Sequence, residues 1–466
     1  MTVSRTPVFV AVFLVVVSVG TGLVGADVND GAAVPVLPAA DGVLHDGTAG
    51  GVSDAPTVGS ALLARLGSSS GDASGDPVTL DPAADGDAPV RVGVIGSAFG
   101  ATEALDGRVA ARYRTGGPRF GLVAGDHGAA VAGVVARRAD ESALYLASVG
   151  YEPTPASYAR AVDWLIAQDV DVLVDAGSYY PRTADGMDRI ARAAERATAA
   201  GTVFVTSGGN AARRHWRGEV SGTGWAVFDD NATEGNRLGD GPVAGSVTLR
   251  LYWSGGGDYD LYLYRDIADG HDRVVAKSTR GSGHAEAIDA VVPRGAYYAA
   301  VYARDSGDGP VDLFAARHRL AFAGANGSAV APATADGVIS VGALGRDGGL
   351  AAYSAVDTDV RAPGTVTPAD GTMLRGTSAA APAVAGVVAR MTAAAGGEGL
   401  TPAQVERLLR ETAADGRVSP DAAVAAARAG SRTGDDELQG TGDGGDPGGE
   451  RDTNHDGEGS RTFPGP

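Results

Sequence analysis

The chain of 466 residues has no cysteine and almost no lysine. Of its 38 basic residues, only Lys277 is a lysine and the other 37 are arginines. The absence of cysteine excludes disulfide bonds, thiolate metal sites and cysteine-based catalysis. The formal net charge of −19 argues against nucleic acid or an anionic membrane surface as a partner.

Long apolar runs are also scarce, and the one that approaches membrane-spanning length lies at the N-terminus. Arg5 precedes the almost wholly apolar residues 7–22, and residues 24–26 read Val-Gly-Ala, like a small-residue cleavage site. This pattern predicts a secretory signal peptide over residues 1–26. An uncleaved membrane anchor is the alternative, because residues 8–26 are almost long enough to span a bilayer. We therefore expect an extracellular protein, secreted or anchored at its N-terminus.

Composition separates the ends of the chain from its centre. Residues 27–88 are rich in Gly, Ala, Asp, Ser and Pro, which predicts a flexible linker or a short pro-region. Residues 431–466 contain almost nothing apolar, which predicts a disordered acidic tail. Between these ends, we expect two α/β parts, 89–212 and 321–430, separated by an all-β part, 213–320.

The two α/β parts alternate between apolar, β-branched runs and helical patterns. The predicted buried strands are 90–95, 143–149, 170–174, 202–206 and 337–344, and the predicted helices are 157–165, 187–194 and 378–395. This alternation is typical of a doubly wound parallel sheet with helices on both faces. Ligand sites in such folds lie at the carboxyl ends of the strands, so functional residues should follow the strands.

The all-β part has short runs of alternating polar and apolar residues. They lie at 247–253, 258–264, 274–276, 287–292, 297–303 and 311–315, the spacing of a β-sandwich. The Gly-Asp-Tyr-Asp-Leu-Tyr-Leu-Tyr run at 257–264 and the Gly-Ala-Tyr-Tyr run at 295–298 resemble the bacterial pre-peptidase C-terminal β-sandwich. That resemblance implies glycan or protein binding. Asp258, Asp260 and Asp266 are interpreted as exposed turn carboxylates, and we predict no metal and no cofactor.

The most informative stretch is residues 376–386, which read Gly-Thr-Ser-Ala-Ala-Ala-Pro-Ala-Val-Ala-Gly. A Gly-Thr-Ser turn running into a small, apolar helix places Ser378 at a helix N-terminus, where negative charge is stabilised. By itself this fits either an ordinary helix cap or a nucleophile. The full pattern resembles the active-site serine segment of the subtilisin-like serine peptidases (subtilases). That resemblance implies a subtilisin-like fold, peptide or protein substrates, and Ser378 as nucleophile.

Two further segments extend the resemblance in the order that the family requires. Residues 125–133 read Gly-Asp-His-Gly-Ala-Ala-Val-Ala-Gly and resemble the family's His segment, which implies that His127 is the general base. Asn210 ends a Ser-Gly-Gly-Asn turn after a predicted strand, and the resemblance implies that its amide stabilises the oxyanion. A structural histidine and a turn asparagine are the alternative interpretations.

The chain departs from the family at the triad carboxylate. Residues 92–96 read Val-Gly-Val-Ile-Gly, so Gly96 stands where the family has Asp, 31 positions before His127. Asp175, which follows a predicted strand that the resemblance places beside the cleft, is a candidate substitute carboxylate. A solvated cleft carboxylate, or one that binds basic substrate side chains, is the alternative for Asp175.

Two functions follow from these patterns. The first is a secreted subtilisin-like serine endopeptidase of impaired activity, working in salt, because acidic excess with almost no lysine resembles proteins of salt-loving archaea. The second is an inactive pseudopeptidase that binds peptides or glycans outside the cell, which the glycine at position 96 favours. A purely structural surface protein would leave the three motifs unexplained.

Overall fold

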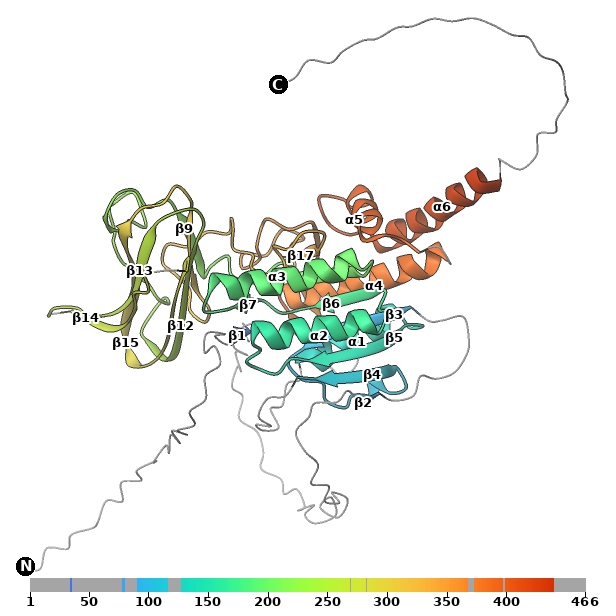
Figure 1. The fold of residues 1–466 in the computed structure, drawn as a ribbon, viewed down its shortest axis with the longest axis horizontal. Helices are drawn as coiled ribbons and strands as arrows, with labels where there is room; N and C mark the ends of the chain where they lie inside the picture. The colour runs from blue at the N-terminus through green and yellow to red at the C-terminus, as the bar shows by residue number, and fades with distance from the viewer. Residues whose placement is uncertain are drawn as a thin grey trace, which may run out of the picture.

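The computed structural model describes residues 34–35, 78–79, 90–115, 127–268, 270–281, 283–367, 373–396 and 399–439. An eight-stranded sheet in the order β18-β17-β8-β6-β3-β5-β4-β2 forms the centre of the α/β part (Figure 1). Every neighbouring pair is parallel except β2 with β4. The strands are β2 (Val78–Thr79), β3 (Arg91–Gly96), β4 (Val109–Arg114), β5 (Ala143–Ser148), β6 (Val172–Asp175), β8 (Val203–Ser207), β17 (Ile339–Leu344) and β18 (Val360–Pro363).

Helices cover both faces of this sheet. Helices α1 (His127–Arg138) and α4 (Thr377–Ala395) pack on one face, and α2 (Pro155–Ala167) and α3 (Ala184–Ala199) pack on the other (Figure 1). Alternate residues of each strand serve the two cores, so Val94 packs towards α1 and α4 while Ile95 packs towards α2 and α3. The predicted doubly wound parallel sheet with helices on both faces is confirmed.

Two further helices follow α4 in the chain. Helix α5 (Pro402–Glu411) begins with a capping box between Thr401 and Gln404, and α6 (Pro420–Gln439) packs against α4. Helix α6 runs into the segment that we expected to be a disordered tail, and residues 440–466 lie outside the described part. Among described helices, only α4 is long and apolar enough to cross a membrane, and it is largely buried in the protein core.

The N-terminal predictions fall mostly outside the described residues, including the whole predicted signal peptide, 1–26. Within the predicted linker, two short strands are present. β1 (Val34–Pro35) pairs antiparallel with β7 (Tyr179–Tyr180), and β2 pairs antiparallel with β4. At these four residues the segment is paired strand: β1 and β7 form a separate two-stranded pair, and β2 extends the edge of the central sheet at β4.

Between β8 and β17 the chain forms an all-β insertion. Its strands pair antiparallel and lie beside the α/β part (Figure 1). The first half of β15 pairs with β12 and its second half with β13, so this one strand joins two groups of strands. The strands are β9 (His215–Gly218), β10 (Gly224–Trp225), β11 (Asn236–Arg237), β12 (Val243–Trp253), β13 (Asp258–Asp266), β14 (Arg273–Ser278), β15 (Ala285–Asp305) and β16 (Val311–Ala315).

A buried arginine connects the insertion to the α/β part. The Nε of Arg250 donates to the backbone oxygen of Tyr180 at 3.0 Å, and its Nη2 lies 3.1 Å from both carboxylate oxygens of Asp289. The Tyr180 ring packs on Phe314 of β16, with centroids 5.2 Å apart. Because Arg250 is fully buried, this pairing fixes the insertion at the carboxyl-end side of β6.

Candidate active site

Ser378 lies at the start of α4 and is buried. Helix α4 begins at Thr377, after Gly376, whose φ of 90° lies in the region that favours glycine. The Ser378 hydroxyl donates a hydrogen bond to the backbone oxygen of Ala176 at 2.9 Å. As predicted, the residue stands at a helix N-terminus, where unpaired N–H groups stabilise negative charge.

Asn210 lies directly against the serine segment. Its Oδ1 accepts from the Thr377 backbone N–H at 3.0 Å and from the Thr377 hydroxyl at 3.2 Å. A backbone N–H must donate to oxygen, so these bonds fix the amide orientation and leave Nδ2 available as a donor. The close packing explains the glycine at 376, because a Cβ there would lie 2.7 Å from the Asn210 Nδ2.

His127 is the first residue of α1, and α1 packs against α4. The residue as a whole is half-buried, but its Nε2 is enclosed and has no hydrogen-bond partner among the described residues. Burial lowers the pKa of His127 to about 4, so the imidazole is neutral at pH 7. An enclosed, neutral imidazole with a free nitrogen is able to accept a proton, although the Ser378 hydroxyl is turned towards Ala176.

Gly96 ends β3 beside the helix that His127 opens. A Cβ at position 96 would lie 2.9 Å from the Gly128 Cα and 3.0 Å from the Phe99 ring. The position therefore faces the start of α1, where a carboxylate could orient a histidine. Phe99 takes up the space that such a side chain would need.

Asp175 does not substitute for that carboxylate. Its Oδ1 accepts from the Gly177 backbone N–H at 2.8 Å and the Tyr179 hydroxyl at 3.1 Å, and its Oδ2 accepts from the Tyr158 hydroxyl at 2.9 Å. These partners lie on the α2 and α3 face, opposite α1 and α4. The candidate substitute was therefore wrong, because strand alternation turns Asp175 away while Ala176 faces the serine.

The Asp175 carboxyl is also a poor fit to the solvated alternative. It is 1 % exposed, and burial raises its pKa to about 6 despite three hydrogen bonds that favour the charged form. Its partners Tyr158 and Tyr179 pack edge to face, with centroids 4.8 Å apart. Asp175 is thus a buried structural carboxylate beneath the site.

Comparison with known proteins gives both a family match and a fold. Residues 277–442 match the model of the subtilase family (Peptidase S8), a range that contains Ser378 but neither His127 nor Asn210. The CspB protease of Clostridium perfringens aligns at 16% identity over 73% of this chain and 95% of its own, with a TM-score of 0.52. The fold is that of the subtilase-family proteases.

Other solved structures of this kind align less closely. The nisin leader peptidase NisP of Lactococcus lactis aligns at 15% identity over 74% of this chain and 88% of its own, with a TM-score of 0.42. Fervidolysin of Fervidobacterium pennivorans aligns at 18% identity over 73% of this chain and 43% of its own, with a TM-score of 0.39. No curated protein sequence matches the chain.

Sequence reasoning missed two features of the candidate active site. The Thr377 hydroxyl accepts from the Gly209 backbone N–H at 3.2 Å while donating to Asn210, so it joins the two motifs. A pocket of about 350 Å³ lies beside Asn210 and Gly376 and is lined by three arginines, Arg214, Arg346 and Arg375. Two of them are near a motif in sequence, but only the fold brings the three together.

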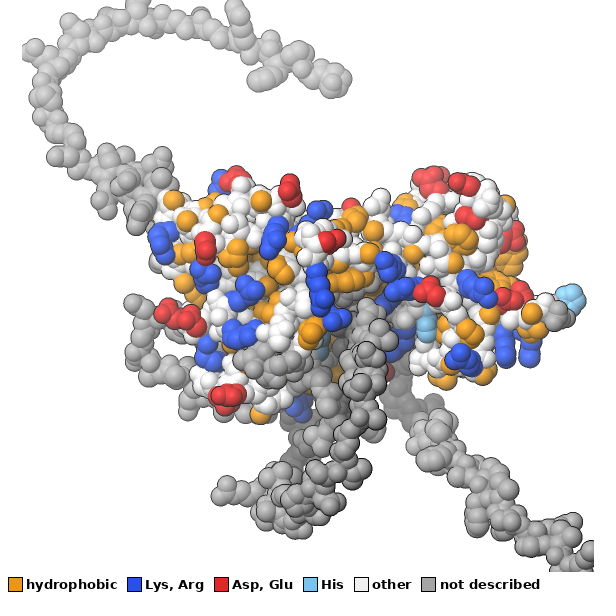
Figure 2. Space-filling view, turned by 180° about the vertical axis from the view of Figure 1, so that it is seen from behind, with side chains coloured by type: hydrophobic (Ala, Val, Ile, Leu, Met, Phe, Trp, Pro, Cys, Tyr) orange, Lys and Arg blue, Asp and Glu red, His pale blue; other side chains and the backbone are white. Residues whose placement is uncertain are grey.

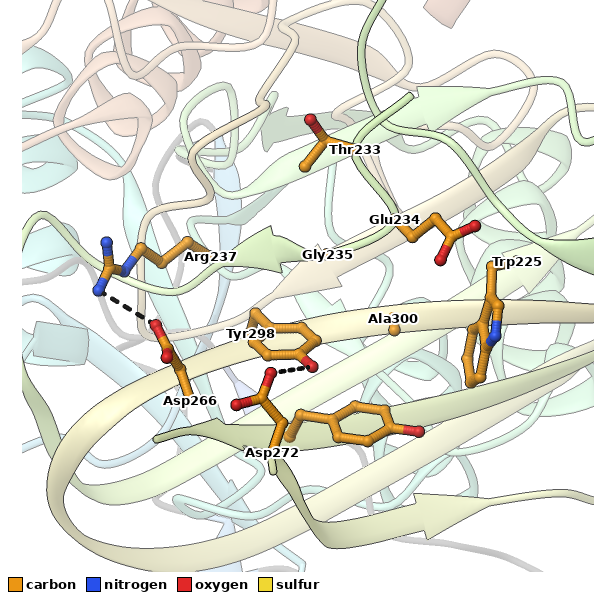
Figure 3. Close-up of a pocket in the computed structure, with 10 residues that line it drawn as sticks. Trp225, Thr233, Glu234, Gly235, Arg237, Asp266, Asp272, Tyr298 and Ala300 are labelled. Carbon is orange, nitrogen blue, oxygen red and sulfur yellow. Dashed lines mark hydrogen bonds and ion pairs between the residues drawn. The ribbon is translucent and has the colours of Figure 1, made fainter. Parts of the chain in front are cut away.

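A second pocket, of about 530 Å³, lies on the insertion (Figure 3). Trp225 and Tyr298 flank Ala300 there, and the Tyr298 hydroxyl donates to Asp272 at 2.8 Å (Figure 3). The Tyr264 and Tyr298 rings stack with centroids 5.1 Å apart. Among the described residues, no group of three or more His, Asp or Glu side chains could hold a metal ion.

Proposed function

We propose that the protein is a secreted serine endopeptidase that hydrolyses peptide bonds through an acyl-enzyme on Ser378. The observation that supports it best is the hydrogen-bonded unit of Asn210 and Thr377 at the start of α4, beside the buried Ser378. In this reaction, Asn210 Nδ2 and the N–H groups of the α4 terminus would donate to the oxyanion formed by attack of Ser378.

The chemistry begins when the Ser378 hydroxyl leaves Ala176 and turns towards His127. Its oxygen attacks the peptide carbonyl carbon while its proton passes to the free Nε2 of His127. Collapse of the tetrahedral intermediate breaks the C–N bond, and the leaving amine takes the proton from His127. Water then hydrolyses the ester by the same proton route, which restores Ser378.

We propose that this reaction is slow. An imidazole with a pKa of about 4 is a weak base, and the imidazolium formed during attack lacks a carboxylate partner among the described residues. Losing the triad carboxylate typically lowers turnover by about 10⁴-fold and leaves residual catalysis from the oxyanion donors. The subtilase fold and the geometry around Ser378 favour catalysis, while Gly96 limits its rate.

Fluorophosphonate labelling of the purified protein in molar salt tests this function. We expect labelling that requires both Ser378 and His127, so Ser378→Ala and His127→Ala should each abolish or strongly reduce it. A folded protein that reacts no faster than its Ser378→Ala variant would contradict the proposal. Circular dichroism on each variant confirms that the comparison is between folded proteins.

The second candidate function is a binding protein without catalysis. It is favoured by Gly96 and by the aromatic pocket of the insertion, where rings and carboxylates form one open surface (Figure 3). We propose that this insertion is a β-sandwich of the pre-peptidase C-terminal type that binds glycan or protein. A protein that does not react with fluorophosphonate but is retained on insoluble polysaccharide would support this function over the first. The Trp225→Ala variant should then lose the retention.

Export and a saline environment complete the proposal. The N-terminal sequence pattern supports secretion, with anchoring as the alternative, and the near-absence of lysine in an acidic chain supports function at high salt. Detection of the protein in culture medium, with a mature N-terminus near residue 27, tests secretion. An N-terminus at Met1 in the membrane fraction would instead support anchoring.

A further inference from the structure

We propose that the arginine-lined pocket beside Asn210 binds an acidic side chain of the peptide substrate, close to the scissile bond. The inference rests on the proposed function, because it takes a peptide as the substrate of Ser378. Of the ten lining residues that the structure describes, Arg214, Arg346 and Arg375 are arginines, and none is Asp or Glu.

The pocket adjoins the reacting atoms. Asn210 and Gly376 belong to its wall, and Gly376 is two residues before Ser378. A peptide whose carbonyl lies at Ser378 and Asn210 therefore passes the mouth of this pocket. Leu344, Ala351 and Tyr353 supply apolar surface that would pack on the stem of a Glu or Asp side chain.

The two exposed arginines of the pocket, Arg346 and Arg375, differ from many arginines that the structure describes in lacking an ion pair with a described carboxylate. Many arginines here pair with Asp, as Arg196 does with Asp163 at 2.8 Å. Among the described residues, neither Arg346 nor Arg375 lies within ion-pair distance of a carboxylate, and both are exposed. Lys and Arg side chains are spread widely over the middle of the face seen in Figure 2.

A carboxylate is the ligand that this arrangement fits best. Guanidinium groups donate paired hydrogen bonds to carboxylates, and such charge-assisted bonds are about twice as strong as neutral ones. Arg214 is half-buried, and its Nη1 donates to the Ala316 backbone oxygen at 3.4 Å, which holds it at the base of the insertion. One positive charge is therefore fixed, while Arg346 and Arg375 are exposed and can turn towards a ligand, Arg375 by giving up the bond from its Nε to the Met373 sulfur at 3.0 Å.

The test measures binding and not cleavage. Ser378→Ala protein is titrated with octapeptides of one common sequence in which a single Glu is moved along the chain, each beside its Gln counterpart. We expect the Glu peptide to bind about tenfold more tightly than the Gln peptide at one or two positions, the size of one charge-assisted hydrogen bond. Added salt should reduce the difference.

Arg346→Glu in the Ser378→Ala protein should abolish the preference for Glu. Arg407→Glu is the matched control, because Arg407 is exposed on α5, does not line the pocket, and changes net charge equally. Equal binding of Glu and Gln peptides at every position, or equal loss from both variants, would overturn the inference. Cleavage without a Glu preference would leave the peptidase standing and remove the pocket's role, whereas a Glu preference without labelling would keep the pocket and remove the peptidase.

Discussion

The Asn210 side of the candidate active site is tied together by hydrogen bonds, whereas on the His127 side the imidazole Nε2 has no partner among the described residues. Asn210, Thr377 and Gly209 form one network, and its bonds measure 3.0 to 3.2 Å. His127 begins α1 with its Nε2 enclosed and without a partner among the described residues, next to Gly96 and to Phe99, whose ring takes up the space that a carboxylate would need.

The difference separates two parts of one reaction. In the proposed reaction, the Asn210 network would donate to negative charge on the substrate, while an oriented histidine would move the proton. On this proposal the first part is present in the chain and the second is weakened. Residual reactivity at Ser378 would therefore measure how much the oxyanion donors and the helix terminus achieve without an oriented base.

The largest effect should come from restoring a carboxylate on the His127 side of the site. In Gly96→Asp combined with Phe99→Ala, removing the ring leaves room for a carboxylate beside the start of α1, which should orient His127 and raise its pKa. We expect fluorophosphonate labelling to accelerate by about 10²-fold or more, towards the ~10⁴-fold contribution of a triad carboxylate. Labelling rates measured from pH 4 to 8 would also report the higher pKa of His127.

The control for that change is Gly96→Asn with Phe99→Ala, which has the same bulk and no charge. A Cβ at position 96 would still lie near the Gly128 Cα, so both double variants carry the same packing cost. If the folded Asp variant labels no faster than the Asn variant, the missing carboxylate is not what limits His127.

The next effect concerns the Asn210 side of the site. Asn210→Asp keeps an oxygen to accept from the Thr377 N–H but removes the Nδ2 donor, so folding should be preserved while the oxyanion loses its partner. We expect the labelling rate to fall by about 10²–10³-fold. Asn210→Ala should fall as far and should also lower the melting temperature, because Thr377 loses its acceptor. Unchanged labelling in a folded Asn210→Asp protein would show that the amide does not contact the oxyanion.

A smaller effect contrasts His127 with Asp175 through stability. Below pH 6.5 the unfolded chain protonates a histidine that the folded protein keeps neutral down to about pH 4, so His127 makes stability rise with pH across that window. Asp175 has a folded pKa of about 6 and an ordinary value of 3.8, so it makes stability fall as pH rises from about 4 to 6. Each contribution is about 3 kcal/mol, and the two oppose each other.

Single variants should separate these opposing terms. The unfolding free energy of Asp175→Asn, measured with denaturant between pH 4 and 6.5, should rise with pH more steeply than that of the natural chain. That of His127→Gln should instead fall with pH. Asp175→Asn should leave labelling of Ser378 unchanged, because its partners lie on the opposite face of the sheet. A loss of labelling in that variant would restore Asp175 as a contributor to the site.

Much of this arrangement could be predicted from the sequence. Apolar runs such as 90–95 and 202–206 indicated buried parallel strands, and the Gly-Thr-Ser segment indicated a serine at a helix start. The direction of Asp175 could not be predicted. A parallel sheet covered on both faces has apolar residues at every position, so the sequence does not show which face each residue joins.

The arginine-lined pocket could not be predicted from the sequence, for a different reason. Arg214, Arg346 and Arg375 come from three segments that are distant in sequence, and only the tertiary fold brings them together. The location of Gly96 was easier to predict, because the Val-Gly-Val-Ile-Gly segment fixes where the carboxyl end of β3 lies. The close approach of Phe99 to that position followed from no sequence pattern.

The pairing between the two ends of the insertion also affects how the chain folds. Strands β8 and β17 are neighbours in the sheet, yet residues 208–338 separate them. Bringing the ends of so long a flexible segment together has a large entropic cost and slows folding. In the insertion, β9 pairs with β16, so His215 lies opposite Phe314 near the two points of entry and exit. An insertion that folds early would close most of that loop, and the central sheet could then form by short-range closure.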